Sequence, residues 1–278
     1  MNRKRSAFII SVLVFGYAFL YIPLVSVIVY SFNDSRLATI WGGFSTRWYG
    51  ELFRNEQVLD AAFLSLRIAV TTATFATLLG TMAGMVLSRF GRFRGRTLFS
   101  GMVTSPLVMP EVITGLSLLL LFVSLQQLIG WPMQRGFTTI TIAHTTFAMA
   151  YVTVLIQSRL SGMDQSLEEA AMDLGGRPFR VVFDITLPLI APAMVAGWLL
   201  AFTLSLDDLV IATFVSGPGG STLPMLIFSK VKLGVTPDIN ALATLIILCV
   251  SIGVIVAWYA ARQMQRHTEK NIQATAKQ

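Results

Sequence analysis

The sequence has 278 residues, of which 54% are hydrophobic and only 13% are charged, and its mean hydropathy is +0.69. Soluble domains carry about 25% charged residues, so this composition indicates a membrane protein. The net charge of +7 includes no basic run longer than Arg3-Lys4-Arg5, which argues against nucleic-acid binding, and the single cysteine, Cys249, excludes an intramolecular disulfide.

Spanning helices are the first elements that the sequence predicts, because about 20 mostly apolar residues cross a bilayer. Six uncharged runs meet this length: Ser6–Asn33, Ile68–Ser88, Val112–Gln134, Gly136–Ser158, Ile185–Leu206 and Ile239–Ala261. We expect the second span to begin near Ala61, the third near Thr97, and the fifth to extend from about Pro192 to Val215. The run Leu209–Ser229 is also uncharged, but Gly217-Pro218-Gly219-Gly220 interrupts it and favours a loop over a seventh span.

Basic residues indicate how these spans are oriented. Fourteen Lys and Arg lie in the amino end, the loops after spans two and four and the carboxy tail, whereas six lie in the opposite loops. Cytoplasmic loops carry the excess of basic residues, so both termini and the loop after span four are predicted to be cytoplasmic. The predicted organisation is a first span with a periplasmic loop (1–60), a transmembrane domain (61–262) and a cytoplasmic tail (263–278).

The loop 159–189 contains the polar segment EAAMDLGGRPFRVVFDITLP, which follows the fourth span. Ser166 and Glu169 have the spacing of a capping box, Gly175 suits a left-handed helix end, and Pro178 suits the first turn of another helix. The pattern therefore predicts two short helices with a sharp bend between them. The alternative is an amphipathic hairpin resting on lipid headgroups, although its acidic residues would then face an anionic leaflet.

This loop resembles the EAA loop of ABC importer permeases, through Glu169-Ala170-Ala171, Gly175 and Ile185-x-Leu187-Pro188 at the spacing of that pattern. The resemblance implies an all-α membrane protein of the type I ABC importer permease fold, with six spans and a cytoplasmic coupling helix that docks on a separate ATPase. It also implies a second homologous permease, two cytoplasmic ATPase subunits and a periplasmic binding protein, in a bacterial inner membrane. With Asp173, which shares a helix face with Glu169, the expected coupling residues are Glu169, Ala170, Ala171, Asp173, Gly175 and Pro188.

Three carboxylates lie in the predicted spans, namely Glu111, Asp207 and Asp208. Ionisable groups in spans are costly and are functional candidates by default, so we expect these acids to line a pathway for a cationic substrate. On a continuous helix Asp207 and Asp208 would point about 100° apart. The alternative is structural: the acids pair with Arg67 or cap helices where these break.

Two other features bear on the interior of the spans. Pro106 and Pro110 lack backbone donors and are expected to break or kink the third span. His144 lies among threonines in the fourth span, and we interpret it as a side chain that forms hydrogen bonds between packed helices rather than as a ligand.

The segment FTLSLDD from Phe202 and the segment INALAT from Ile239 are similar to the permeases of bacterial polyamine importers of the putrescine and spermidine type. Trp48-Tyr49-Gly50 and Ser105-Pro106 extend the likeness, which covers nearly the whole chain. It implies putrescine or a related polyamine as substrate, and a polyamine-binding protein as partner.

Several chemistries have no motif in this sequence. There is no G-x-x-x-x-G-K-[ST] phosphate loop, so ATP hydrolysis is expected on a partner subunit. No His/Cys cluster, cofactor motif or nucleophile is recognisable, so we expect no metal, cofactor or catalytic residue. The alternative function is an autonomous proton- or sodium-coupled transporter, but such folds often have two matching broken helices, and the sequence shows no matched pair.

Overall fold

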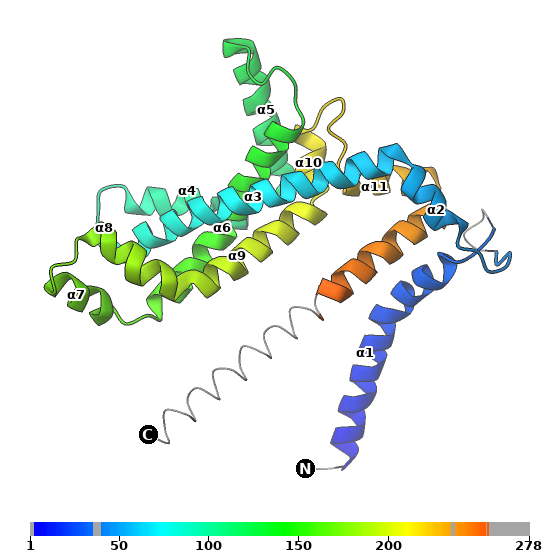
Figure 1. The fold of residues 1–278 in the computed structure, drawn as a ribbon, viewed down its shortest axis with the longest axis horizontal. Coiled ribbons are helices and arrows are strands. Elements are labelled where there is room, and N and C mark those ends of the chain that lie inside the picture. Colours follow the sequence, from blue (N-terminus) through cyan, green and yellow to red (C-terminus); the bar gives the residue numbers. More distant parts are fainter. Residues whose placement is uncertain (1–2, 36–39, 235–236, 254, 256–278) are drawn as a thin grey trace. The chain divides into compact units, whose positions relative to one another are not determined.

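The computed structural model describes residues 3–35, 40–234, 237–253 and 255, and the regular elements of these ranges are helices (Figure 1). The chain divides into two compact units. The central unit comprises residues 57–228, and the terminal unit comprises residues 1–56 together with 229–278.

The central unit carries most of the helices. In chain order they are α3 (Glu56–Arg89), α4 (Arg96–Val108), α5 (Glu111–Ile129), α6 (Phe137–Ser161), α7 (Ser166–Asp173), α8 (Pro178–Val181), the π-helix η1 (Val182–Thr186), α9 (Leu187–Asp207), α10 (Val210–Val215) and the beginning of α11 (Leu223–Leu233). The terminal unit contains α1 (Arg3–Tyr30), α2 (Arg47–Arg54) and an apolar helix over Pro237–Gly253.

Five helical segments of the described residues are long and apolar enough to cross a membrane: Phe8–Tyr30, Glu56–Arg89, Glu111–Ile129, Phe137–Ser161 and Pro178–Asp207. The helix Pro237–Gly253 covers the first part of the predicted sixth span, and the rest of that prediction falls largely outside the described residues. The expected loop after the fifth span is confirmed, because α10 and α11 have only 6 and 11 residues.

The predicted limits of the second and fifth spans were wrong. The second helix begins at Glu56, not Ala61. The fifth does not run from Pro192 to Val215: it begins at Pro178, continues through η1 into α9 and ends at Asp207. Pro178 lies in the first turn of this segment, where a missing N–H costs little, whereas Pro188 follows directly on the π-helical turn of η1.

The third span is broken at a proline, as the sequence predicted. Pro110 precedes α5, and Met109 has an extended backbone with ψ of 135° between α4 and α5. Pro106, in contrast, lies inside α4. Only Pro110 therefore divides this span.

Helix α6 lies at the centre of the packing in the central unit, and 67% of its most apolar stretch is buried. One hydrophobic cluster joins it to α3, α5 and α10 through Ile68, Phe122 and Ile211, and a second joins it to α3 and α9 through Val152, Ile156 and Ile190. Gly80 and Gly84 let α3 approach α6 closely, since a Cβ on either would lie within 2.8 Å of Val152 or Ile156. Small residues at such contacts are typical of helix packing in membranes.

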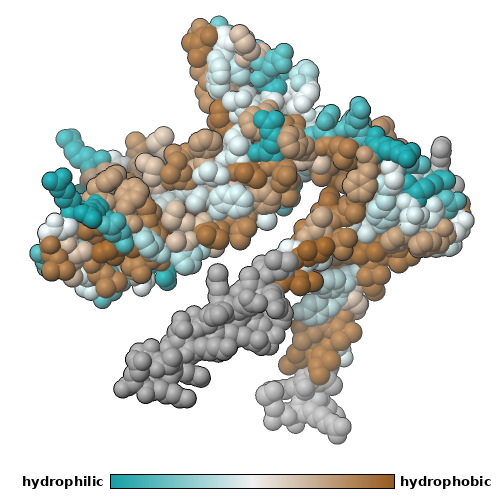
Figure 2. Space-filling view, viewed as in Figure 1, coloured by the Kyte–Doolittle hydropathy of each residue, from teal (hydrophilic) through white to brown (hydrophobic). Residues whose placement is uncertain are grey.

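The surface of the central unit is mainly hydrophobic along the long helices. Hydrophilic residues lie towards helix ends, among them the end that carries α7 and α8, where they are mixed with hydrophobic residues (Figure 2). The same end lies away from α10 (Figure 1). Apolar surfaces along long helices are those expected to face lipid.

Candidate functional site

Helix α7 begins at Ser166, as the capping-box spacing predicted, but the capping box itself does not form. Ser166 is the first helical residue rather than the cap, and no side chain bonds to the free N–H groups from the cap position, which Gln165 occupies. Instead the Ser166 N–H donates to Asp164 Oδ1 at 3.0 Å. This bond holds the pKa of Asp164 below its ordinary value.

The end of α7 is a Schellman motif. The Gly176 N–H donates to the Ala171 carbonyl at 3.0 Å, and the Gly175 N–H donates to the Met172 carbonyl at 2.9 Å. Gly175 has a φ of +88°, which side chains rarely adopt, and α8 starts at Pro178. The predicted pair of short helices with a sharp bend is therefore confirmed.

The predicted coupling residues are accessible on this bend. Glu169, Ala170, Asp173, Gly175 and Pro188 are exposed, and Ala171 is partly buried. Most residues of α7 are exposed, and Glu168 and Ala171 are partly buried. Their role in docking an ATPase stays a prediction.

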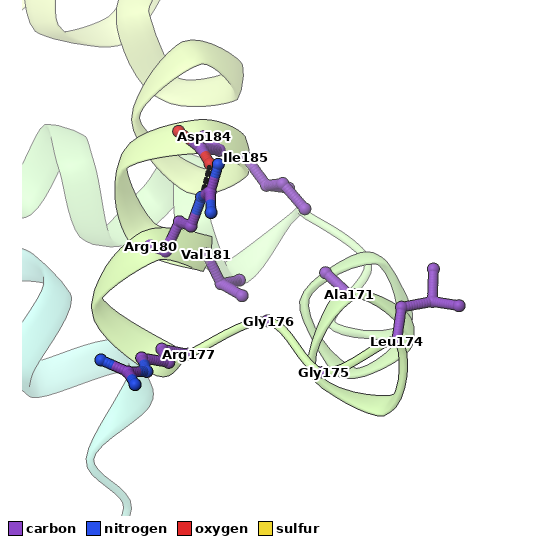
Figure 3. Close-up of a pocket in the computed structure, with 9 residues that line it drawn as sticks. All are labelled: Ala171, Leu174, Gly175, Gly176, Arg177, Arg180, Val181, Asp184 and Ile185. Carbon is purple, nitrogen blue, oxygen red and sulfur yellow. Dashed lines mark hydrogen bonds and ion pairs between the residues drawn. The ribbon is translucent and has the colours of Figure 1, made fainter.

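A groove of about 610 Å³ lies between the end of α7 and α8. Its lining residues are Ala171, Leu174, Gly175, Gly176, Arg177, Arg180, Val181, Asp184 and Ile185 (Figure 3). Leu174 is 91% exposed and points away from α8, while Arg180 and Asp184 form an exposed ion pair on the opposite wall. An exposed leucine beside a groove offers an apolar contact to another protein.

Sequence reasoning missed Glu168, the residue that fixes α7 to the spanning helices. Glu168 Oε2 lies 2.9 Å from Arg89 Nε, and the Thr186 hydroxyl donates to Glu168 Oε1 at 2.9 Å. Both charged side chains are largely buried, with 14% and 15% exposed. An arginine at the end of the second span is visible in the sequence, but it does not show which of two adjacent glutamates meets it.

The second candidate site is the acidic break that follows α9, and here the expectation of a continuous helix was wrong. Asp207 ends α9, and Asp208 has an extended backbone with ψ of 127°. The Asp208 carboxylate accepts the N–H of Ala212 at 2.8 Å and that of Ile211 at 3.4 Å. Asp208 thus bonds to the free N–H groups in the first turn of α10, in agreement with the structural alternative of a cap at a helix break.

His144 holds the same carboxylate from α6. Its Nε2 lies 3.1 Å from Asp208 Oδ2, and its Nδ1 lies 2.8 Å from Ser205 Oγ. The His144 and Asp208 side chains are only 2% and 6% exposed. The interpretation of His144 as a hydrogen-bonding residue between packed helices is confirmed.

The other two acids are placed differently. Asp207 is exposed, and Glu111 is exposed in the first turn of α5. Neither forms an ion pair with another described residue, and the Arg67 guanidinium lies over the rings of Phe63 and Phe137 instead. Within the described ranges no three His, Cys, Asp or Glu side chains are grouped as a metal site would need.

Comparison with known proteins supports a transport permease. The profile of the family described as "Binding-protein-dependent transport system inner membrane component" matches residues 76–270. The chain is 59% identical over 269 residues to the putrescine transport system permease protein PotI of Escherichia coli strain K12, covering 97% of this chain and 96% of that one. It is 45% identical over 246 residues to the spermidine/putrescine transport system permease protein PotC of the same strain, covering 88% and 90%.

Solved structures with the same fold are subunits of bacterial importers. One is a bacterial ABC transporter involved in the import of the acidic polysaccharide alginate, with a TM-score of 0.69, 16% identity and coverage of 95% of this chain and 98% of that chain. Another is a bacterial alginate ABC transporter in complex with an alginate pentasaccharide-bound periplasmic protein, with a TM-score of 0.71, 14% identity and coverage of 90% and 91%. Because these sequence identities are low, the likeness to the solved structures establishes the fold alone.

Proposed function

The chain belongs to the family of inner membrane components of binding-protein-dependent transport systems, and we propose that it forms half of the pathway by which an ATP-driven importer takes up putrescine or a related polyamine. Its relatives PotI and PotC are permeases of putrescine and of spermidine/putrescine transport systems, and they align along most of this chain. The ATP-driven permease is favoured over an autonomous ion-coupled transporter, because the family and the fold are those of importer subunits.

One observation carries the coupling part of this proposal: α7 is an exposed helix that a buried ion pair nevertheless fixes to the spanning helices. Glu169, Ala170 and Asp173 are exposed on α7, so this face of the helix is free to contact another protein. Ala170 and Ala171 allow close approach to the backbone, and Glu169 and Asp173 offer acceptors. We assign this face to a cytoplasmic ATPase.

The remaining partners follow from the same architecture. A second permease chain completes the pathway, two ATPase subunits power it, and a periplasmic binding protein delivers the polyamine; the name of one solved neighbour includes such a periplasmic protein. The excess of basic residues supports a cytoplasmic position for both termini and for α7.

The exposed acids Asp207 and Glu111 are the proposed contacts for the substrate. A polyamine carries a cation at each end, and carboxylates compensate such charges through charge-assisted hydrogen bonds. Asp208, in contrast, already accepts a bond from the backbone of α10 and lies 3.1 Å from His144 Nε2. We therefore assign Asp208 to the support of the break and Asp207 to the pathway.

The test is reconstitution of the importer with its ATPase and binding protein in lipid vesicles. The wild-type complex is expected to take up labelled putrescine only when ATP is present on the side of the vesicle membrane that carries the ATPase. Glu169→Lys, which reverses a charge on the outer face of α7, is expected to lose the co-purified ATPase. Glu51→Lys provides the matched control, since Glu51 is an exposed acid on α2 and is expected to keep the ATPase.

Two results would contradict the proposal. Uptake that follows a proton or sodium gradient without ATP would favour the autonomous transporter. Normal ATPase binding in Glu169→Lys would remove α7 from the docking surface.

A further inference from the structure

We propose that the contact of Glu168 with Arg89 and Thr186 transmits movement of α7 to the spanning helices, and we call this contact the joint. Glu169, its neighbour, faces outward, whereas Glu168 faces the body of the central unit. The inference rests on the proposed function, because it presumes that a partner moves α7. It adds a positioning residue that is not among the coupling residues expected from the spacing of the loop, together with its two partners, Arg89 and Thr186.

The ends of α3, α6, α7 and η1 meet around the side chains of Glu168, Arg89 and Thr186. Glu168 lies in the first turn of α7, Arg89 is the last residue of α3, and Thr186 is the last residue of η1, directly before α9. Arg89 Nη1 also donates to the carbonyl of Leu160, near the end of α6, at 3.3 Å. A displacement of α7 therefore reaches α3, α6 and α9 through one carboxylate and one guanidinium.

The Glu168 cluster is a largely buried contact between α7 and the rest of the central unit. Thr186 is only 2% exposed and the Glu168 and Arg89 side chains are 14% and 15% exposed, whereas most residues of α7 are exposed. The Arg89–Glu168 contact is an ion pair at 2.9 Å in which Arg89 Nε forms no aligned hydrogen bond, while Glu168 Oε1 accepts the hydrogen bond of the Thr186 hydroxyl. Opposite charges attract more strongly in a largely dry site than at an exposed surface. The ion pair thus adds a direct contact between α7 and the end of α3, beside the chain connections to α6 and α8.

The segment that receives the link is irregular. Thr186 closes a π-helical turn over Val182–Thr186, and such turns occur frequently at functional sites. A π turn contains one residue more than an α turn, so its hydrogen bonds can be rearranged locally. The joint therefore acts where α9 is best able to change its register or direction.

A purely stabilising pair and a transmitting joint predict different results. If the pair only stabilises the fold, its loss lowers the yield of the complex, but each assembled complex transports normally. If it transmits movement, the assembled complex keeps its ATPase and hydrolyses ATP, but less substrate is moved for each ATP.

The experiment uses the whole importer in lipid vesicles, with its ATPase and substrate-loaded binding protein. Glu168→Gln keeps the shape and an acceptor for Thr186 but removes the charge that Arg89 meets. We expect normal co-purification of the ATPase and a fall of about fivefold or more in putrescine moved per ATP hydrolysed. Glu51→Gln, the same exchange at an exposed acid on α2, is the matched control and is expected to match wild type.

Two further variants keep the test decisive. The double exchange Glu168→Arg with Arg89→Glu is expected to restore part of the coupling that either single exchange loses. If Glu168→Gln does not accumulate, Thr186→Val leaves the ion pair in place and removes one bond, and we expect coupling to fall about threefold.

The following outcomes would contradict the proposal that Glu168 transmits movement of α7. Unchanged uptake per ATP in Glu168→Gln, or in Thr186→Val when the first variant is absent, would leave only a stabilising pair. Loss of the ATPase from Glu168→Gln would make Glu168 a docking residue. The proposed function is tested apart from this: if Glu169→Lys still loses the ATPase while Glu168→Gln couples normally, docking on α7 stands and the joint fails.

Discussion

Two pairs of adjacent acids flank the helical segment that forms the fifth span. Glu168-Glu169 lie before it in α7, and Asp207-Asp208 lie at its carboxy-terminal end. Helix α9 alone contributes 21 residues between them, which is about 30 Å at the rise of an α-helix. In each pair one carboxylate turns inward and is bonded, Glu168 to Arg89 and Asp208 to His144. The other, Glu169 or Asp207, is exposed.

The inward partners differ in kind. Glu168 meets a guanidinium and a hydroxyl from the ends of other helices, so its bonds fix one helix to several others. Asp208 meets an imidazole and the backbone N–H groups of the helix that follows it, so its bonds hold open a break in the chain. The comparison teaches that the inward acid fixes a helix end, which leaves its exposed neighbour available to another molecule.

The prediction with the largest expected effect is that the two acid pairs lie on opposite sides of the membrane. Reporter fusions are expected to place a tag at the carboxy terminus in the cytoplasm and a tag near Gly219, just beyond α10, in the periplasm. The reason is the excess of basic residues on the side of the termini and of α7. A periplasmic carboxy terminus would overturn the six-span count and with it the separation of the two pairs.

The next contrast separates Asp208 from Asp207. Asp208→Ala is expected to lower the stability of the complex by about 2–4 kcal/mol, because it removes a helix cap and the carboxylate that contacts the buried His144. Asp207→Asn is expected to leave stability within about 0.5 kcal/mol, as exposed substitutions do, while putrescine uptake falls. Thermal unfolding of the purified complex and vesicle uptake, measured on the same preparations, check both.

Glu111→Gln belongs to the same series, since Glu111 is exposed and is expected to behave like Asp207. If both Asp207→Asn and Glu111→Gln transported normally, these acids would not line the pathway and selectivity would reside in the binding protein. If Asp207→Asn lowered stability more than Asp208→Ala, the assignment of inward and outward roles would be reversed.

The smallest contrast tests the bend beside Glu169. Gly176→Ala places a Cβ about 2.6 Å from the Ala171 carbonyl oxygen, so the Schellman motif must shift, and we expect a partial loss of co-purified ATPase. The control is Gly162→Ala at the end of α6, where φ is −88° and the nearest atoms lie 3.8 Å away. Equal ATPase binding in both variants would show that the shape of the bend does not matter for docking.

Local features of the sequence determined a large part of this protein. Hydropathy identified the all-helical membrane class, Pro110 identified the broken third span, and Gly175 and Pro178 identified the bend after α7. The spacing of the loop led to the importer permease family. These features follow from length, apolar content and permitted backbone angles, each of which a short stretch of chain carries by itself.

Tertiary structure decided which member of each acid pair turns inward. Glu168 and Glu169 are chemically alike and adjacent, and so are Asp207 and Asp208, so no local rule distinguishes them. Their partners come from distant segments: Arg89 ends α3, and His144 lies 61 residues before the Ser205 that it also bonds. The bonding of a buried carboxylate depends on where other helices place their donors, and helix packing alone fixes those positions.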